Sequence, residues 1–165
     1  MSTSLYQTPG TQAAITITLA SLATSSSLTA GQASTVVTPS NWADALVSGV
    51  IETGTSPTGG EIDVYVWAQQ DDTPNYPDSI TGTNAAKSFA SANVRDAALV
   101  LARTIACDTT SNQAYQVKAF SVAALFSGVL PKRWGIWVTH SSGVNLNSTG
   151  ANHELVVLPY TWTQA

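Results

Sequence analysis

The stretch 61–69, Glu-Ile-Asp-Val-Tyr-Val-Trp-Ala-Gln, decides the fold class of this chain. Its even-numbered positions are all aliphatic, whereas the positions between them hold Asp63, Tyr65 and Trp67. This two-residue period is typical of a β-strand with one face in a core. We expect Tyr65 and Trp67 on the other face either to contact a partner or to be covered by the long loop 70–93, which follows directly.

The chain on both sides of this stretch has similar short patterns separated by Gly, Pro, Ser and Asn. We predict further strands over 15–19, 34–37, 42–52, 98–106, 115–121, 131–140 and 153–163, with a helical turn over 122–126. Residues 94–106 also fit a helical stripe, so their strand assignment has a helical alternative. Seven or eight strands with only short helical turns predict an all-β, single-domain β-sandwich that is jelly-roll-like. The predicted core includes Ile17, Val64, Val66, Ile136, Val138 and Leu155.

The composition excludes several classes of function. Only 10% of the 165 residues are charged, and the six Lys and Arg against ten Asp and Glu give a net charge of −4. An electrostatic nucleic-acid binder needs clustered basic residues, so we expect no nucleic-acid partner. No apolar run has the about 18 residues of a membrane helix, so we expect no membrane partner either.

The two ends of the chain differ in character. Residues 1–12 have little apolar content and contain the turn Pro9-Gly10, so we predict a flexible N-terminal arm followed by one domain over 13–165. Leu5 and Tyr6 are larger than a solvated tail needs, and we expect them to anchor the chain either to a neighbouring subunit or to a different protein of the same assembly. The first residues lack the basic and apolar regions of a secretory signal, so we expect synthesis in a cytoplasm.

Two groups of residues have the chemistry of metal ligands. Asp71, Asp72 and Asp78 carry carboxylates but lack the spacing of a calcium loop. His140 and His153 end one predicted strand and begin the next, so they are candidates for a cross-strand pair. A zinc site needs a third or fourth protein ligand, and the sequence suggests none on the same face. We therefore expect no metal and no cofactor.

No pattern in the chain is typical of an enzyme. The chain has one cysteine, Cys107, which we expect to be an inert residue at a strand end. A G-x-S-x-G elbow is absent from the sequence, and neither histidine follows a nucleophile motif. A hydrolase using the acidic residues of 70–78 is the least favoured alternative. We expect no catalytic residues.

Three segments resemble small structural proteins of tailed bacteriophages. They are Phe-Ser-Val-Ala-Ala-Leu-Phe-Ser-Gly-Val-Leu-Pro-Lys-Arg-Trp at 120–134, Trp-Val-Thr-His-Ser-Ser-Gly-Val-Asn-Leu-Asn-Ser-Thr-Gly at 137–150, and Ile-Thr-Ile-Thr-Leu-Ala-Ser-Leu-Ala-Thr-Ser-Ser at 15–26. The resemblance covers most of the chain and is weakest over 70–95. It transfers no site residue.

The resemblance implies a non-enzymatic virion component with a jelly-roll-like fold. The function expected from it is that of a capsid decoration (cement) protein, a homotrimer on the outside of the head that binds the major capsid protein. The alternative is a tail or fibre module that binds a bacterial surface glycan through exposed Trp and Tyr side chains. The localisation expected is the virion, after synthesis in the host cytoplasm.

Overall fold

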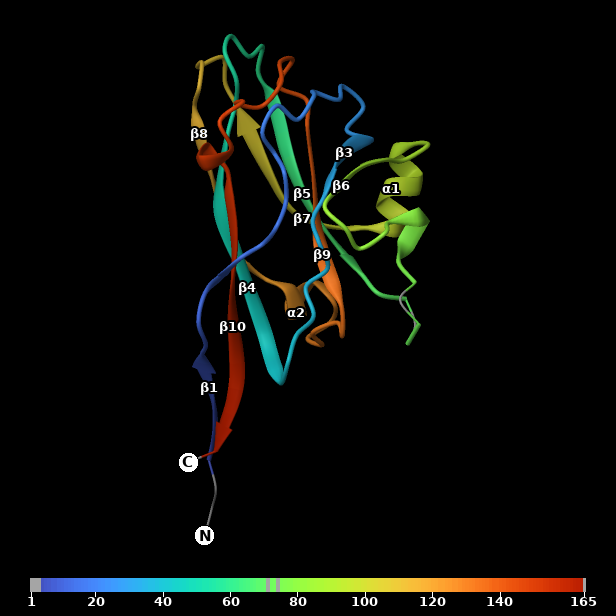
Figure 1. Cartoon of the computed structure of the whole chain (residues 1–165), viewed down its shortest axis with the longest axis vertical. Helices are drawn as coiled ribbons and strands as arrows, with labels where there is room; N and C mark the ends of the chain where they lie inside the picture. Colours follow the sequence, from blue (N-terminus) through green and yellow to red (C-terminus); the bar gives the residue numbers. More distant parts are fainter. Residues whose placement is uncertain (1–3, 71, 74, 165) are drawn as a thin grey trace.

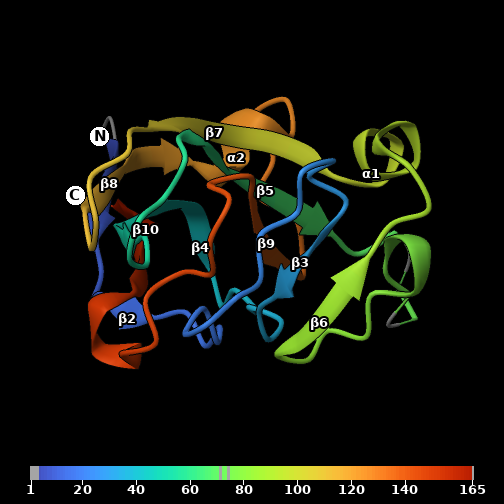
Figure 2. The same cartoon turned by 90° about the horizontal axis from the view of Figure 1, so that it is seen from above.

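Two five-stranded antiparallel sheets pack face to face in the computed structural model, which describes residues 4–70, 72–73 and 75–164 (Figure 1). One sheet, called the β4 sheet, has the strand order β1-β10-β4-β8, with β2 also paired to β10. The other, the β5 sheet, has the order β6-β3-β9-β5-β7. The view from above shows the two sheets as two layers (Figure 2). The prediction of an all-β sandwich is confirmed.

The strands pair in a nested order. The innermost pair is β5 (Gly60–Ala68) with β7 (Val100–Cys107). Each further pair joins strands that are farther apart in the chain. These pairs are β4 (Trp42–Glu52) with β8 (Ala114–Ser121), β3 (Ala30–Ala33) with β9 (Trp134–His140), and β2 (Ala13–Ala14) with β10 (Glu154–Gln164). Successive pairs belong in turn to the β5 sheet and to the β4 sheet. This is the connectivity of a double-sheet jelly roll, in which one long antiparallel ribbon is wound into a sandwich.

Two strands lie outside the nested set. β1 (Leu5–Pro9) adds to β10 at one edge of the β4 sheet, and β6 (Ala85–Ser88) adds to β3 at one edge of the β5 sheet. Both are edge strands, and both come from segments in which the sequence predicts no strand.

The main core fills the space between the two sheets. Its fully buried members include side chains from both sheets: Val47, Ile51, Ile62, Val64, Val66, Trp134, Ile136 and Val138. Of the six predicted core residues, five are buried, including Leu155, while Ile17 is only partly buried at the margin of the cluster. The alternation along these strands therefore identifies their core faces correctly.

A second core lies on the outer face of the β5 sheet. Residues 76–99, called the cap, lie on this side of the molecule: η1 (Pro77–Ser79) and α1 (Ala92–Ala98) lie over the face, and β6 continues the sheet at its β3 edge. Figure 2 shows α1 and β6 on this side. Ile80, Phe89 and Leu99 of the cap are buried against Tyr65, Trp67 and Trp137 of the sheet. Because both its faces are covered, β9 is buried at every one of its residues.

The ambiguous stretch 94–106 contains both a helix and a strand. Ser91 caps α1 by accepting a hydrogen bond from the backbone N–H of Val94, and Leu99 is extended and ends the helix. β7 then begins at Val100. The predicted strand over 98–106 is thus correct over most of its length, and the helical pattern belongs to the residues before it.

Two predicted strands are not found at the predicted positions. Residues 15–19 form no strand, although Ile15 and Leu19 are buried and Ile17 is half-buried. This segment is extended, and its backbone groups bond singly to several elements, as when Ile15 N–H donates to the Leu155 carbonyl. The strand predicted over 34–37 lies earlier, as β3.

The smaller elements agree with the sequence. α2 (Val122–Leu125) is a single turn capped by Ser121, and Gly128 follows it with a φ of 87°, a left-handed conformation that favours glycine. η2 (Gly150–Asn152) lies in the loop before β10. Among the described residues, no helix has the length and apolar content needed to cross a membrane.

Candidate functional site

The two ends of the chain form a two-stranded ribbon that projects from the sandwich (Figure 1). β1 pairs with the end of β10 over five residues, from Leu5 opposite Gln164 to Pro9 opposite Tyr160. β4 begins at Trp42, opposite Thr161, so β10 has no β4 partner beyond that point. We call residues 5–9 together with 160–164 the terminal ribbon.

The terminal ribbon exposes large apolar side chains on both its faces. Residues opposite each other in an antiparallel pair lie on the same face, so Leu5, Gln7 and Trp162 share one face. On that face Leu5 is 67% exposed and Trp162 is 60% exposed. Tyr6, which is 49% exposed, lies on the opposite face. Exposed apolar side chains of this size often mark a surface that binds another protein.

The same ribbon contains no charged residue. Neither strand of the ribbon has an Asp, Glu, Lys, Arg or His. Its polar residues are uncharged, and two of them bond across the strands, with 2.8 Å between the hydroxyl oxygens of Thr8 and Thr163. The ribbon can therefore be buried against another surface without the cost of desolvating a charge.

The N-terminal arm differs from its prediction. The sequence predicts a flexible segment over 1–12, but residues 5–9 form β1 and Gly10 N–H donates to the Pro159 carbonyl at 2.8 Å. The reason is that the end of β10 extends beyond β4, and the backbone groups on its other side pair with residues 5–9. Leu5 and Tyr6 are exposed, as an anchor requires, and their role in binding a neighbour stays a prediction.

Tyr65 and Trp67 do not lie on an accessible surface. Tyr65 is 2% exposed and Trp67 is fully buried, so neither side chain is accessible to a partner in this structure. The cap covers both, which is the alternative that the sequence left open. Trp67 makes an edge-to-face contact with Tyr76, with ring centroids 5.0 Å apart, and donates from Nε1 to the Ile136 carbonyl at 3.2 Å.

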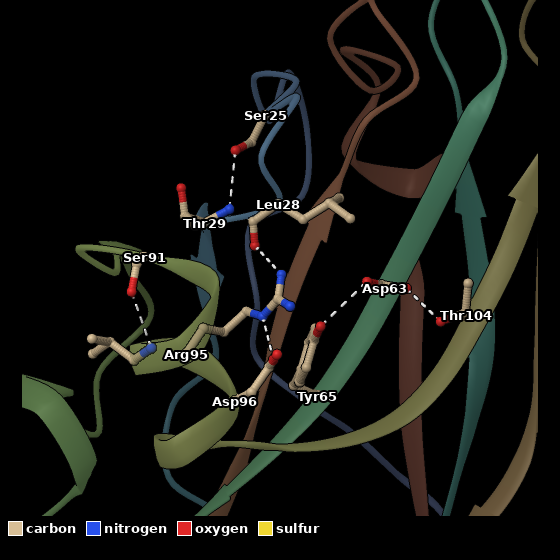
Figure 3. Close-up of polar contacts among 10 residues, drawn as sticks. Ser25, Leu28, Thr29, Asp63, Tyr65, Ser91, Arg95, Asp96 and Thr104 are labelled. Atoms are coloured by element: carbon tan, nitrogen blue, oxygen red, sulfur yellow. Dashed lines mark hydrogen bonds and ion pairs between the residues drawn. The ribbon is translucent and has the colours of Figure 1, made fainter.

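A groove of about 610 Å³ lies beside α1 on the outer face of the β5 sheet. Figure 3 shows the polar residues at this place. The Asp63 carboxylate is buried and accepts hydrogen bonds from the Thr104 hydroxyl at 2.6 Å and the Tyr65 hydroxyl at 3.3 Å. Burial and the nearby Asp63 charge raise the pKa of Tyr65, so its phenol stays protonated and donates to the carboxylate.

Arg95 joins α1 to the loop before β3. Its guanidinium lies over the Tyr65 ring at 4.9 Å, donates from Nη1 to the Leu28 carbonyl at 2.7 Å, and donates from Nε to Asp96 at 2.7 Å (Figure 3). The groove therefore has a carboxylate and a cation that are each bonded to neighbours within the chain. These contacts join the cap to the sheet and to the loop before β3.

The candidate metal ligands do not converge. Asp72 pairs with Lys132 at 3.1 Å and Asp78 with Lys87 at 3.2 Å, while Asp71 lies outside the described residues. Within the described ranges, no three His, Cys, Asp or Glu side chains are grouped as a metal site requires.

The two histidines are not a cross-strand pair, because β9 and β10 belong to different sheets. His140 is buried, with Nε2 3.0 Å from the Leu22 carbonyl and Nδ1 3.0 Å from the Ser142 hydroxyl. His153 is bonded separately: its Nε2 is 2.8 Å from the Asn147 carbonyl, and its Nδ1 accepts from the Glu52 N–H. Both imidazoles thus hold loops in place.

Cys107 is the last residue of β7 and is buried. Burial, followed by the negative charges of Asp108 and Glu61, raises the pKa of its thiol to about 11. The thiol is therefore protonated at neutral pH and is a poor nucleophile.

The sequence does not single out Trp162 as a site residue. In the sequence, Trp162 is one of several large side chains on the outer face of the last predicted strand. The structure shows that it lies where β10 extends beyond β4, and that it is left exposed there. Comparisons of the chain with protein-family models, with curated proteins and with solved structures found no match.

Proposed function

We propose that this chain is a non-enzymatic structural protein of a bacteriophage virion, and that it acts as a capsid decoration protein on the outside of the head. Three features support the proposal. The jelly-roll connectivity is an architecture used by viral capsid proteins, although lectins and enzymes use it as well. The low charge content suits a protein that is packed against others. The resemblance of its sequence to phage structural proteins points to the same class.

The observation that carries the proposal is the terminal ribbon. It is an uncharged extension of a well-packed domain, with Leu5 and Trp162 exposed on one face. An element of this kind attaches a domain to a neighbouring subunit in an assembly, because it adds contact area without enlarging the domain.

The alternative of a glycan-binding tail or fibre module is less well supported. That proposal rests on outward aromatic side chains that stack on sugar rings, and the cap covers Tyr65, Trp67 and Trp137. Among the described large aromatic side chains, Tyr6 and Trp162 are the ones exposed, and both lie on the terminal ribbon. They face opposite sides of it, so they do not form one stacking platform.

The test locates the protein in the particle. Cryo-electron microscopy of intact particles is expected to show the jelly roll on the outer surface of the head in many copies. A location in the tail, at a few copies per particle, would replace the decoration role by the tail-module alternative. Absence of the protein from purified particles would refute the virion proposal.

A binding experiment then tests the ribbon. Heads stripped of the protein are incubated with wild-type protein or with the double variant Leu5→Ser/Trp162→Ser. Loss of two exposed apolar side chains that become buried is expected to weaken retention by about tenfold or more. Val129→Ser is the matched control, because Val129 is 69% exposed and lies after α2, outside the ribbon. Equal retention of the double variant and the control would show that the ribbon does not attach the domain.

A further inference from the structure

The two sheets have four edges in their described part, and three of them are protected against pairing with another chain. The edges are formed by β8, by β7, by β6, and by β1 together with the two-residue β2, since both of these pair with the same side of β10. Arg103 of β7 donates to two carbonyls of β8, those of Lys118 at 3.2 Å and Ala119 at 2.8 Å, so its side chain occupies the gap between these two edges. β6 is four residues long and includes Lys87. Short strands and charged side chains are the usual means of keeping an edge unpaired.

β1 has no protection of this kind over most of its length. It contains no charged residue, and its one proline, Pro9, is at the end nearer the sandwich. An open, uncharged edge is a template for an additional strand. The other three edges have features that prevent pairing with another chain, whereas β1 lacks them. We therefore infer that β1 can accept an additional strand.

The hydrogen bonding of Gly10 shows which groups of β1 are free. Gly10 N–H donates to the carbonyl of Pro159, the residue opposite it in the register of the ladder. Residues that bond to a given neighbour alternate along an antiparallel strand, so Tyr6 and Thr8 direct their backbone groups toward β10. Leu5, Gln7 and Pro9 therefore direct theirs away from β10, toward the open edge. Leu5 and Gln7 each offer an N–H and a carbonyl there, whereas Pro9 offers only a carbonyl.

We propose that β1 pairs antiparallel with β1 of a second copy of this chain, about a twofold axis at Gln7. In this register the two Gln7 residues exchange both backbone hydrogen bonds. Each Leu5 N–H donates to the Pro9 carbonyl of the second copy, so the missing N–H of Pro9 is not needed. The pairing makes four backbone hydrogen bonds and joins the two β4 sheets into one.

The chemistry of the ribbon favours a second copy as its partner. Each chain has a net charge of −4, so two copies repel each other where their charged surfaces meet, but the ribbons are uncharged. In the proposed register Leu5 lies opposite Pro9 and Tyr6 opposite Thr8, so no large apolar side chain faces a charge. A twofold contact brings the same surface of both subunits together, which makes each of these pairs occur twice.

The proposal is independent of the virion function. It also predicts a dimer, whereas the resemblance to phage proteins implies a trimer.

The decisive variant is Gln7→Pro in the full-length protein. The Gln7 N–H points away from β10, so proline removes the hydrogen bonds to the second copy and leaves the β1–β10 ladder intact. The loss of two hydrogen bonds is expected to raise the dimer dissociation constant by about 30-fold, measured by sedimentation equilibrium. Gln7→Ala is the matched control, because it keeps the N–H and is expected to remain a dimer. Thermal unfolding followed by circular dichroism checks that both variants are folded.

Amide hydrogen exchange gives a second measurement on the wild type. Protection of the Leu5 and Gln7 amides is expected to rise with protein concentration, while protection of Thr8, which already bonds to β10, stays constant. A monomeric wild-type protein at every accessible concentration would overturn the proposal. So would a dimer or trimer whose dissociation constant is the same for Gln7→Pro and Gln7→Ala.

Discussion

Replacement of Trp67 by alanine tests whether the cap is held on the β5 sheet by a real second core. A buried indole removes roughly 200 Å² from water, and about 25 cal/mol per Å² gives about 5 kcal/mol. Alanine retains a small part of this, and the hydrogen bond to the Ile136 carbonyl is lost as well. We therefore expect Trp67→Ala to lower the free energy of unfolding by about 3–5 kcal/mol. The total stability of a domain is about 5–15 kcal/mol, so the variant is expected to be marginally folded.

The assay is urea unfolding followed by far-ultraviolet circular dichroism, because the substitution changes the tryptophan fluorescence. Trp162→Ala is the matched control: it makes the same chemical change at a side chain that is 60% exposed, and we expect it to change stability by less than about 0.5 kcal/mol. Hydrogen exchange in Trp67→Ala is expected to speed up first at Phe89, which packs in the same cluster. Similar losses for the two tryptophans would refute the second core.

Three further substitutions test other parts of the structure. A Cβ atom at Gly135 would overlap the indole of Trp67, so Gly135→Ala is expected to cost about 1–3 kcal/mol and to lower the melting temperature, as measured by calorimetry. Ile136→Asp puts a carboxylate between the sheets and is expected to prevent soluble expression, whereas Ile136→Val should cost only about 0.5–1.5 kcal/mol; equal yields would contradict the assigned core face. Burial lowers the pKa of His140, so the unfolded chain binds its proton more readily and stability should fall as pH drops below about 6.5. Urea midpoints from pH 8 to 5 should show a smaller loss for His140→Gln, and an unchanged slope would rule out His140 as the cause.

Several elements of the fold are evident in the sequence because their signals are local. The strand predicted over 42–52 matches β4 residue for residue, and the stretch 61–69 differs from β5 by one residue at each end. Most residues of 42–52 are apolar, and apolar residues recur at every second position of 61–69. Each pattern predicts a strand without information from elsewhere in the chain. The helical turn before Gly128 is predicted for the same reason, since its capping serine and terminating glycine lie within a few residues.

What the sequence could not decide depends on contacts between distant residues. Residues 15–19 have the alternation of a strand but form none, because no single strand lies beside them to complete a ladder. Tyr65 and Trp67 are buried only because the cap folds back over them.

The terminal ribbon is the plainest case. By themselves, residues 5–9 lack the apolar content to fold, and the sequence predicts a flexible arm. They become a strand because the nested winding of the jelly roll brings the end of β10, more than 150 residues away, alongside them. Local polarity thus determined which segments are strands and which of their faces are apolar. The tertiary structure decided their partners and their exposure, because backbone hydrogen bonds and burial both require a second segment whose position no local pattern specifies.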